Sequence, residues 1–300
     1  MTTTDPGALV VPVPSGADLA VRARGVRRAY GETLAADGVD LDVVRGEVLA
    51  LLGPNGAGKT TTTEILEGYR RRDGGEIDVL GTDPAHPTAT WRSRLGIVLQ
   101  TAADLGDLTV EESVSHFAGY YPAPRDVGEV IEAVGLGGKR STRGFDLSGG
   151  QRRRLDVALG IVGRPELLFL DEPTTGFDPE ARRDFWELIT RLKEEGTTIL
   201  LTTHYLEEAE VLADRVAVIA RGRVIACDIP SRLGGRDDRT ATVHWREAGE
   251  ARSEHTTEPT RVVGELSSRL GGEVPGLAVL RPTLEDVYLS LIGHDSEVSA

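Results

Sequence analysis

The sequence predicts an α/β protein in which a mostly parallel β-sheet lies between helices, with a helical insertion and a small C-terminal domain. Over residues 19–228, short apolar runs alternate with amphipathic stretches, as expected when strands are buried between helices. Between residues 108 and 145 no buried strand is evident, and apolar residues recur at helical spacing. The polar segments 234–239 and 247–258 then dilute the apolar pattern, which indicates a domain boundary.

The individual elements follow from the same patterns. Apolar runs favour buried strands at residues 48–52, 95–99, 167–170, 197–202 and 216–219. Four sets of apolar residues at helical spacing predict helix faces: Val110, Val114 and Phe117; Val130, Ile131 and Val134; Phe185, Leu188, Ile189 and Leu192; and Leu284, Val287, Tyr288 and Leu291, with Thr283 as the N-cap.

Composition limits the classes of function. The chain has 34 basic and 48 acidic residues, a net charge of −14, which repels nucleic acid and anionic membrane surfaces. Its apolar runs are far shorter than the ~20 residues that cross a bilayer, so we expect no direct membrane insertion. Cys227 is the only cysteine, which excludes an intrachain disulfide and favours the cytoplasm. Residues 1–18 contain no Lys or Arg, unlike a signal peptide, and are expected to form a flexible tail.

One segment has the pattern of a phosphate-binding loop, G-x-x-x-x-G-K-[ST], and lies between a predicted strand and a helix. Its glycines let backbone N–H groups turn toward phosphate oxygens, and the helix adds the positive end of its dipole. Lys59 supplies charge to the outer phosphates, and the Thr60 hydroxyl can bind Mg²⁺. The alternative is a flexible glycine turn without a ligand. The residues of this loop are Gly53, Pro54, Asn55, Gly56, Ala57, Gly58, Lys59, Thr60 and Thr61.

Two carboxylates, Asp171 and Glu172, follow the predicted strand at residues 167–170. They lie at the carboxyl end of a buried strand, where open α/β sheets bind their ligands. Asp171 is suited to hold Mg²⁺ through water. Glu172 is suited to orient and deprotonate the water that attacks a γ-phosphate. The alternative is a pair of solvated charges that opens the next loop.

The segment Leu147-Ser148-Gly149-Gly150-Gln151 separates the classes of phosphate-binding protein. Ser148, with Gln151 three residues later, has the pattern of a capping box, so we expect a helix to begin here. The N–H groups of that helix start and the Gly149-Gly150 backbone can bind an anion. Taken alone, the segment is as well explained by an ordinary helix start.

With these three segments in this order, the chain resembles the ATP-binding cassette (ABC) family over residues 19–228. The resemblance implies a P-loop NTPase (RecA-like) core with an antiparallel β subdomain and an α-helical subdomain at about residues 101–146. A small α/β accessory domain would follow at residues 229–300. By the same resemblance, residues 53–61 are the Walker A loop, residues 147–151 the signature and residues 167–172 Walker B.

The resemblance also implies roles for four single residues. It makes Tyr30 the residue that stacks on adenine and Gln100 the Q-loop glutamine, which contacts nucleotide and metal. It makes Asp178 the D-loop aspartate and His204 the switch histidine that contacts the γ-phosphate.

Each of these four residues has a structural alternative. Tyr30 could cover a sheet edge, and Gln100 could be an ordinary polar residue at a strand end. Asp178 precedes Pro179, so it also fits the N-cap of a helix with Pro at N1, and both roles can hold together. A lone histidine such as His204 is usually structural, and only its context favours the phosphate contact.

A narrower resemblance covers residues 147–183 and 282–289. These segments are similar to the ATP-binding subunits of daunorubicin-resistance-type exporters, within the type-2 ABC exporters. The similarity implies a multidrug- or antibiotic-type exporter whose membrane channel is a separate transmembrane permease subunit. Phe177 departs from the family, in which Leu is common at this position, but it remains apolar. Only the resemblance favours export over import.

We therefore expect an ATPase that uses ATP and Mg²⁺ at the cytoplasmic face of the membrane, held there by the permease. A signature loop belongs opposite the Walker A loop of another subunit, so two copies, head to tail, would sandwich two ATP molecules. The permease is expected to dock between residues 108–145 and the segment after Gln100. A cassette ATPase acting on nucleic acid or ribosomes is the alternative, which the acidic charge disfavours. A kinase or GTPase has no need of the signature.

Overall fold

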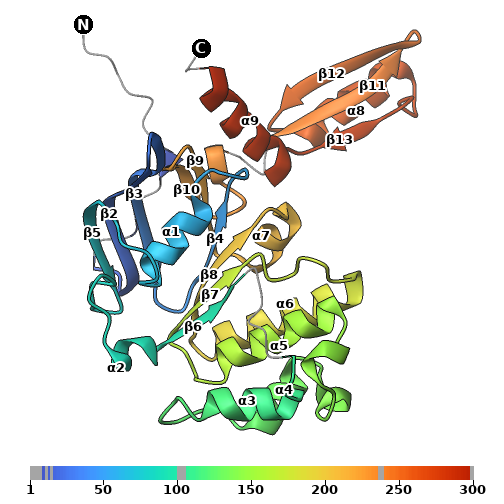
Figure 1. The fold of residues 1–300 in the computed structure, drawn as a ribbon. Helices are drawn as coiled ribbons and strands as arrows, with labels where there is room; N and C mark the ends of the chain where they lie inside the picture. The colour runs from blue at the N-terminus through green and yellow to red at the C-terminus, as the bar shows by residue number, and fades with distance from the viewer. Residues whose placement is uncertain (1–8, 11–12, 14–15, 100–105, 236–239, 298–300) are drawn as a thin grey trace, which may run out of the picture.

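Three β-sheets form the framework of the protein (Figure 1). The computed structural model describes residues 9–10, 13, 16–99, 106–235 and 240–297. A central seven-stranded sheet has the order β1-β10-β9-β4-β8-β7-β6. One three-stranded sheet, β3-β2-β5, is antiparallel and precedes most of the central strands in sequence, and another, β12-β11-β13, lies near the C-terminus.

The central sheet confirms the α/β prediction. Its core strands β9, β4, β8, β7 and β6 pair in parallel, while β10 runs antiparallel to β9. Every residue of β4 and β8 is buried, as expected for strands covered on both faces. The carboxyl ends of the parallel strands therefore meet at one edge of the sheet. The bounds are β1 (Leu9–Val10), β4 (Val48–Leu52), β6 (Leu95–Val98), β7 (Leu167–Asp171), β8 (Thr198–Thr203), β9 (Arg215–Ala220) and β10 (Arg223–Asp228).

The antiparallel sheet consists of β2 (Leu19–Tyr30), β3 (Thr33–Val44) and β5 (Gly74–Val79). Helix α1 (Lys59–Leu66) lies between it and the central sheet, where Ile65 of α1 joins one buried cluster with Val21, Val39, Leu51 and Ile219. The phosphate-loop helix is thus packed between two sheets, and its position is fixed from both sides.

The remaining helices mostly cover the other face of the central sheet. In the insertion, α3 and α4 contact each other and α5, and their predicted faces are buried at Val110, Val114, Val130 and Ile131. The predicted stripe at residues 185–192 lies on α6 and is buried. The bounds are α2 (Ala89–Arg92), α3 (Val110–Ala118), α4 (Val127–Ala133), α5 (Gly149–Ile161), α6 (Pro179–Glu194) and α7 (Leu206–Leu212), with short 3₁₀ turns at Gly137–Lys139, Gly144–Asp146 and Leu233–Gly235.

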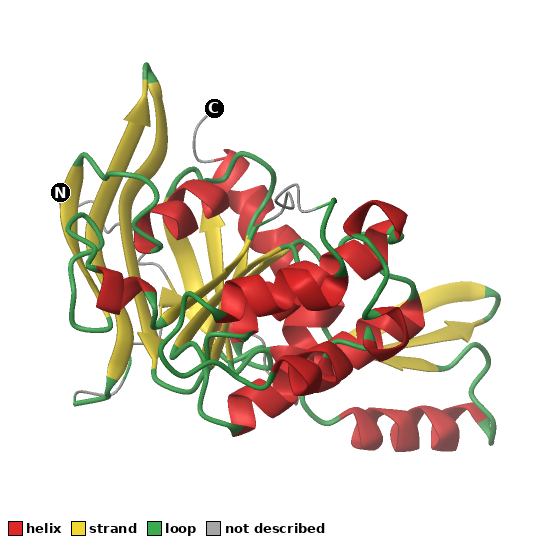
Figure 2. Cartoon of the chain, turned by 60° about the horizontal axis from the view of Figure 1, so that its bottom comes forward, coloured by secondary structure: helices red, strands yellow, loops and turns green. Residues whose placement is uncertain are grey.

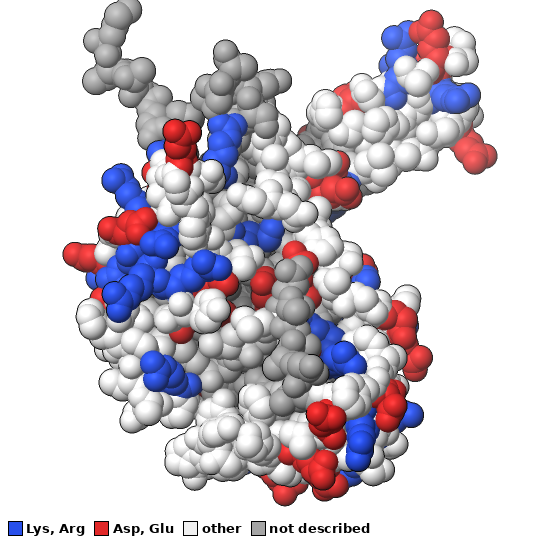
Figure 3. All heavy atoms as spheres, in the orientation of Figure 1, with Lys and Arg blue, Asp and Glu red and all other residues white. Residues whose placement is uncertain are grey.

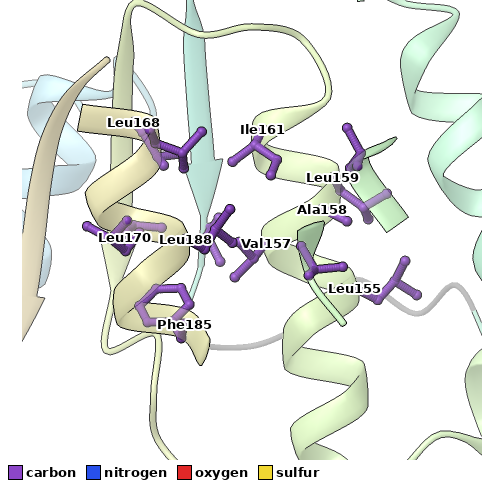
Figure 4. Close-up of a cluster of buried hydrophobic side chains, with 14 of the residues drawn as sticks. Leu155, Val157, Ala158, Leu159, Ile161, Leu168, Leu170, Phe185 and Leu188 are labelled. Atoms are coloured by element: carbon purple, nitrogen blue, oxygen red, sulfur yellow. The ribbon is translucent and has the colours of Figure 1, made fainter. Parts of the chain in front are cut away.

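Helices α5 and α6 pack on the central sheet through interdigitating aliphatic side chains. Val157 and Ile161 of α5 meet Leu188 of α6 over Leu168 and Leu170 of β7 (Figure 4). All five are at most 4 % exposed. This packing fixes the start of α5, at the predicted signature, relative to the strand that ends in Asp171.

The C-terminal region forms a separate small core and a docked helix. Strands β11 (Ala241–Glu247), β12 (Glu250–Thr256) and β13 (Ala278–Leu280) pack on α8 (Pro259–Leu270), with Trp245 in the core. This unit projects from the rest of the molecule (Figure 2). Helix α9 (Leu284–Glu297) begins with the predicted Thr283 cap, whose hydroxyl accepts from Asp286 N at 3.1 Å. None of the described helices is both long and apolar enough to cross a bilayer.

The predicted apolar face of α9 is present, but it packs elsewhere than the sequence order suggests. Leu284 is 1 % exposed and lies in a cluster with Leu52 of β4 and Leu233, against which Val287 and Leu291 also pack. None of these contacts is to the β11–β13 core. Helix α9 therefore closes back onto the central sheet, beside α7.

Candidate nucleotide-binding site

The predicted phosphate loop connects β4 to α1, and two of its glycines have no room for a side chain. A Cβ atom at Gly53 would lie 2.3 Å from the carbonyl oxygen of Ile219, and one at Gly58 would lie 2.1 Å from that of Ala35. Gly58 also has φ 102°, in the left-handed region that favours glycine. The loop is therefore pressed against neighbouring backbone, and its shape is set by the fold.

The start of α1 is open to an anion. Gly58 is its N-cap and has no side chain to satisfy the first N–H groups, and no acidic residue lies in the first turn. Asn55, Gly56 and Thr60 are exposed at this point. Unsatisfied N–H groups with the positive end of the helix dipole suit a phosphate.

Lys59 is folded back onto its own loop. Its Nζ donates to the carbonyl oxygens of Gly53 at 2.6 Å and Pro54 at 3.2 Å, and the residue is 7 % exposed. Burial lowers the pKa of Lys59, while the carboxylates of Glu172 and Asp171 oppose that shift. The ammonium group thus lies between the phosphate loop and the predicted carboxylates, held by neutral carbonyls that a phosphate can replace.

The two carboxylates lie where β7 meets β8. The register pairs Asp171 with Thr202, whose hydroxyl donates to Asp171 Oδ1. The N–H of Glu172 donates to the carbonyl oxygen of Thr202 at 3.0 Å, so one residue of β8 positions both acids. Sequence analysis did not single out Thr202. Its signal, a threonine at the carboxyl end of the neighbouring strand, becomes informative only with the register.

Glu172 and His204 face each other. Nδ1 of His204 lies 3.3 Å from Oε1 of Glu172, and the Glu172 side chain is 14 % exposed against 44 % for His204. Glu172 has φ 45°, an uncommon conformation for a residue with a side chain, which recurs at functional sites. Lys59, Asp171, Glu172 and His204 are therefore brought to one place, at the carboxyl ends of β4, β7 and β8.

The predicted signature begins a helix, as expected. Ser148 is the N-cap of α5, and both bonds of the capping box are present: Gln151 N to Ser148 Oγ at 3.3 Å, and Ser148 N to Gln151 Oε1 at 3.1 Å. Ser148 and Gly149 are exposed, and Gly150 is partly exposed. Helix α5 contacts β6 of the central sheet and α3 and α4 of the helical insertion, so the predicted signature lies on a helix that packs against the insertion.

Asp178 has the predicted capping geometry. Its Oδ1 accepts from Ala181 N at 2.8 Å, with Pro179 at the first position of α6. Phe177, the residue that departs from the family, is 7 % exposed and meets Phe185 edge to face at 6.0 Å. The substitution is therefore accommodated in the core, and Asp178 itself remains exposed.

Tyr30 lies at the end of β2 with its ring 38 % exposed. The guanidinium carbons of Arg28 and Arg70 lie 4.9 and 5.6 Å from the ring centroid, a cation–π arrangement. Lys and Arg side chains gather on this side of the molecule (Figure 3). An adenine stacked on Tyr30 would have to displace or adjoin a guanidinium group. Gln100, the other predicted nucleotide contact, lies outside the described residues.

Arg153 is a structural feature of the site that sequence analysis missed. It lies on α5, is 7 % exposed, and donates to three backbone carbonyls, those of Leu99, Asp171 and Pro173. Burial lowers its pKa, and Asp156, 4.0 Å away, opposes that shift. One side chain therefore joins the signature helix to both sides of Glu172 and to the end of β6. The middle arginine in a run of three carries no sequence signal for this role.

A groove of about 500 Å³ opens between the end of α1, β6, α3 and α5. Its walls are mostly aromatic or aliphatic, from Tyr69, Ile97, Phe117, Tyr121 and Leu159. Tyr69 is 78 % exposed and Ile97 38 %. It lies at the boundary between the central sheet and the helical insertion, close to where the partner was expected to dock.

Chemically, the site provides an anion-binding helix start, a cation, and carboxylates that suit a divalent ion. No cluster of three or more His, Cys, Asp or Glu that could enclose a metal by itself occurs among the described residues. Mg²⁺ does not require one, because it binds through one or two protein oxygens together with phosphates and water. The Thr60 hydroxyl and the Asp171 carboxylate fit that donor set.

Comparison with known proteins places this geometry in a family. The ABC transporter family model matches residues 36–175. The daunorubicin resistance ATP-binding protein DrrA3 of Streptomyces coeruleorubidus is 39 % identical over 94 % of this chain and 98 % of its own length. The Nod factor export ATP-binding protein I of Burkholderia orbicola is 38 % identical over 91 % of this chain and 97 % of its own.

A solved structure, described as the ATP-binding subunit of an ABC transporter, has the same fold with a TM-score of 0.68. It covers 90 % of this chain and 98 % of its own at 23 % identity. Fold, motif geometry and full-length similarity agree, and the chain belongs to the ABC transporter family as one of its ATP-binding, ATPase subunits.

Proposed function

We propose that this chain hydrolyses ATP to drive a multidrug- or antibiotic-type exporter, working at the cytoplasmic face of the membrane through a separate transmembrane subunit. The observation that carries the proposal is the convergence of Lys59, Asp171, Glu172 and His204 at adjacent strand ends beside the start of α1. A cation, two acids and an imidazole at an anion-binding helix start suit phosphoryl transfer to water.

The residues take the following roles. Residues 53–61 wrap the phosphates of ATP with backbone N–H groups, and Lys59 exchanges its two carbonyl partners for phosphate oxygens. Thr60 and Asp171 hold Mg²⁺, which, when bound, neutralises charge on the phosphates. Glu172 accepts a proton from the attacking water, and His204, 3.3 Å away, contacts the γ-phosphate. Tyr30 stacks on adenine, and Gln100 contacts nucleotide and metal.

A second copy of the chain completes each site. Ser148, Gly149, Gly150 and Gln151 form a second anion-binding helix start, on α5, although the chain already has one on α1. The second is redundant unless it faces another nucleotide. In a head-to-tail dimer it binds the γ-phosphate held by the partner's loop, with Asp178 at the same interface.

The membrane subunit docks in the groove lined by Tyr69, Ile97, Phe117, Tyr121 and Leu159. Tyr69 is exposed, and Phe117 and Tyr121 are half-buried. Accessible aromatic side chains around a concave surface are typical of protein-binding sites. Ile97 of β6 lines the groove, and two residues further on the Leu99 carbonyl accepts from Arg153, which also donates to the carbonyl of Asp171. A docked segment is therefore linked through β6 and Arg153 to the backbone beside Glu172.

The exporter assignment rests on relatives named for daunorubicin resistance and Nod factor export, both similar over more than nine-tenths of this chain. The test is a comparison of wild type with Lys59→Ala. The wild-type chain should hydrolyse MgATP and should co-purify with a membrane-spanning subunit when the two are co-expressed. Lys59→Ala should lose nucleotide affinity and turnover. Unchanged binding and turnover in that variant would refute the site.

A further inference from the structure

Glu67 is a buried acid without a cation. It follows the last residue of α1, is 8 % exposed, and lines the groove described above. Within the part of the chain that the structure describes, its carboxyl group has no ion pair or hydrogen bond. Buried carboxyl groups are normally paired or hydrogen-bonded, so this one needs an explanation.

The surroundings of Glu67 are unfavourable for a negative charge. A helix C-terminus carries partial negative charge, and Glu67 lies at that end of α1. Burial raises its pKa to about 8, and the charges of Asp171 and Glu64 add to that shift. The carboxyl group therefore weakens the isolated chain. A residue that serves only the fold would be expected to be apolar or amide here.

The groove limits which group could pair with the Glu67 carboxyl group. Its walls are mostly apolar and aromatic, and among the described residues Arg92, also in its lining, makes no ion pair with the Glu67 carboxyl group. A segment with apolar side chains and one basic group fits such a lining, because its apolar side chains can pack against the walls of the groove and its cation can pair with the Glu67 carboxyl group.

We propose that Glu67 is the acceptor for a Lys or Arg side chain of the membrane-spanning subunit, inserted when its cytoplasmic segment docks in this groove. The inference rests on the proposed function and adds the chemistry that selects the partner. Helix α1 carries Lys59 at one end and adjoins Glu67 at the other, about 12 Å apart at 1.5 Å per residue. The docked cation therefore reaches the helix that holds the phosphates of ATP.

The test uses the whole chain, co-expressed with its membrane-spanning subunit and purified through a tag on that subunit. Glu67→Gln keeps the shape and removes the charge, and we expect retention of the chain to fall by about tenfold or more, as for the loss of one partner of a buried pair. Reversing the charge with Glu67→Lys should abolish retention. Replacing one particular basic residue of the membrane subunit by Glu should restore it.

Two controls separate docking from folding. Glu129→Lys changes an exposed acid in a different cavity, lined by α4, α5 and α6, and should leave retention unchanged. In the free chain, Glu67→Gln should raise the melting temperature and preserve basal ATPase activity, whereas a structural acid would lower both when replaced.

The outcomes are distinct. If wild type is retained and both Glu67 variants are retained equally well, the inference is wrong and the proposed function stands. If wild type hydrolyses ATP but is not retained by the membrane protein, the proposed partner is wrong, and the inference falls with it.

Discussion

Replacing Arg153 by Met should weaken both the fold and the catalytic step. The change keeps the aliphatic stem and removes the guanidinium group, which leaves the carbonyls of Leu99, Asp171 and Pro173 without their donor. A buried acceptor left unpaired, such as the Pro173 carbonyl, costs about 1–3 kcal/mol, and the part-buried carbonyls of Leu99 and Asp171 cost less because water can reach them. Part of this is offset, because the buried guanidinium group itself carries a desolvation cost, seen in its lowered pKa. We therefore expect a net loss of about 3 kcal/mol of unfolding free energy.

The effect on activity follows from the position of two of these carbonyls on either side of Glu172. Their release should misplace the Glu172 carboxylate more than the phosphate loop, so kcat should fall while KM for ATP changes little. Arg153→Lys should be intermediate, because an ammonium group cannot reach three acceptors as the planar guanidinium does. Urea unfolding and steady-state ATPase assays measure the two effects. A Met variant within about 0.5 kcal/mol of wild type and with normal kcat would refute this account.

Two other predictions concern the core. Cys227 is buried, and burial raises the pKa of its thiol to about 11. Between the ordinary thiol pKa and this raised value, the thiol is protonated in the folded protein and ionised in the unfolded chain. The thiol should therefore resist a disulfide reagent at pH 8 until urea unfolds the chain, and rapid labelling of native protein would contradict the buried position. Leu284→Ala should cost about 2–5 kcal/mol, because Leu284 anchors α9 to the central sheet. Thermal unfolding measures this, and a loss below about 0.5 kcal/mol would show that α9 does not dock as described.

The parts of the site that are built from residues adjacent in sequence were predictable from the sequence. The phosphate loop, the Asp171-Glu172 pair and the Ser148–Gln151 capping box each lie within a few residues, so their patterns specify both geometry and element type. The central strands followed from apolar runs, although β8 begins and ends one residue later than expected, β6 ends one residue earlier, β7 ends one residue later, and β9 is one residue longer at each end.

Features that depend on contacts between distant segments were not predictable. Thr202 serves the two acids only through the β7–β8 register, and Arg153 acquires its three acceptors only when α5 packs beside β7. Glu67 resembles any acid at the end of a helix until the groove is present. The pattern of α9 indicated an apolar face, but it could not specify that this face packs on the central sheet.

The central claim, that two chains share each ATP site, is tested most directly by light scattering after size-exclusion chromatography. Glu172→Gln should lower hydrolysis by ~10² or more while ATP still binds, because the amide cannot accept the proton. With MgATP this variant should elute as a dimer near twice the chain mass of 32.2 kDa, and without nucleotide as a monomer.

Adding Ser148→Arg places a bulky cation at the exposed start of α5, which the proposed dimer would set opposite the partner's phosphate loop. The double variant should remain near 32.2 kDa with MgATP, while its own loop still binds ATP weakly. A double variant that dimerises with ATP as well as Glu172→Gln alone would show that the signature does not close the site.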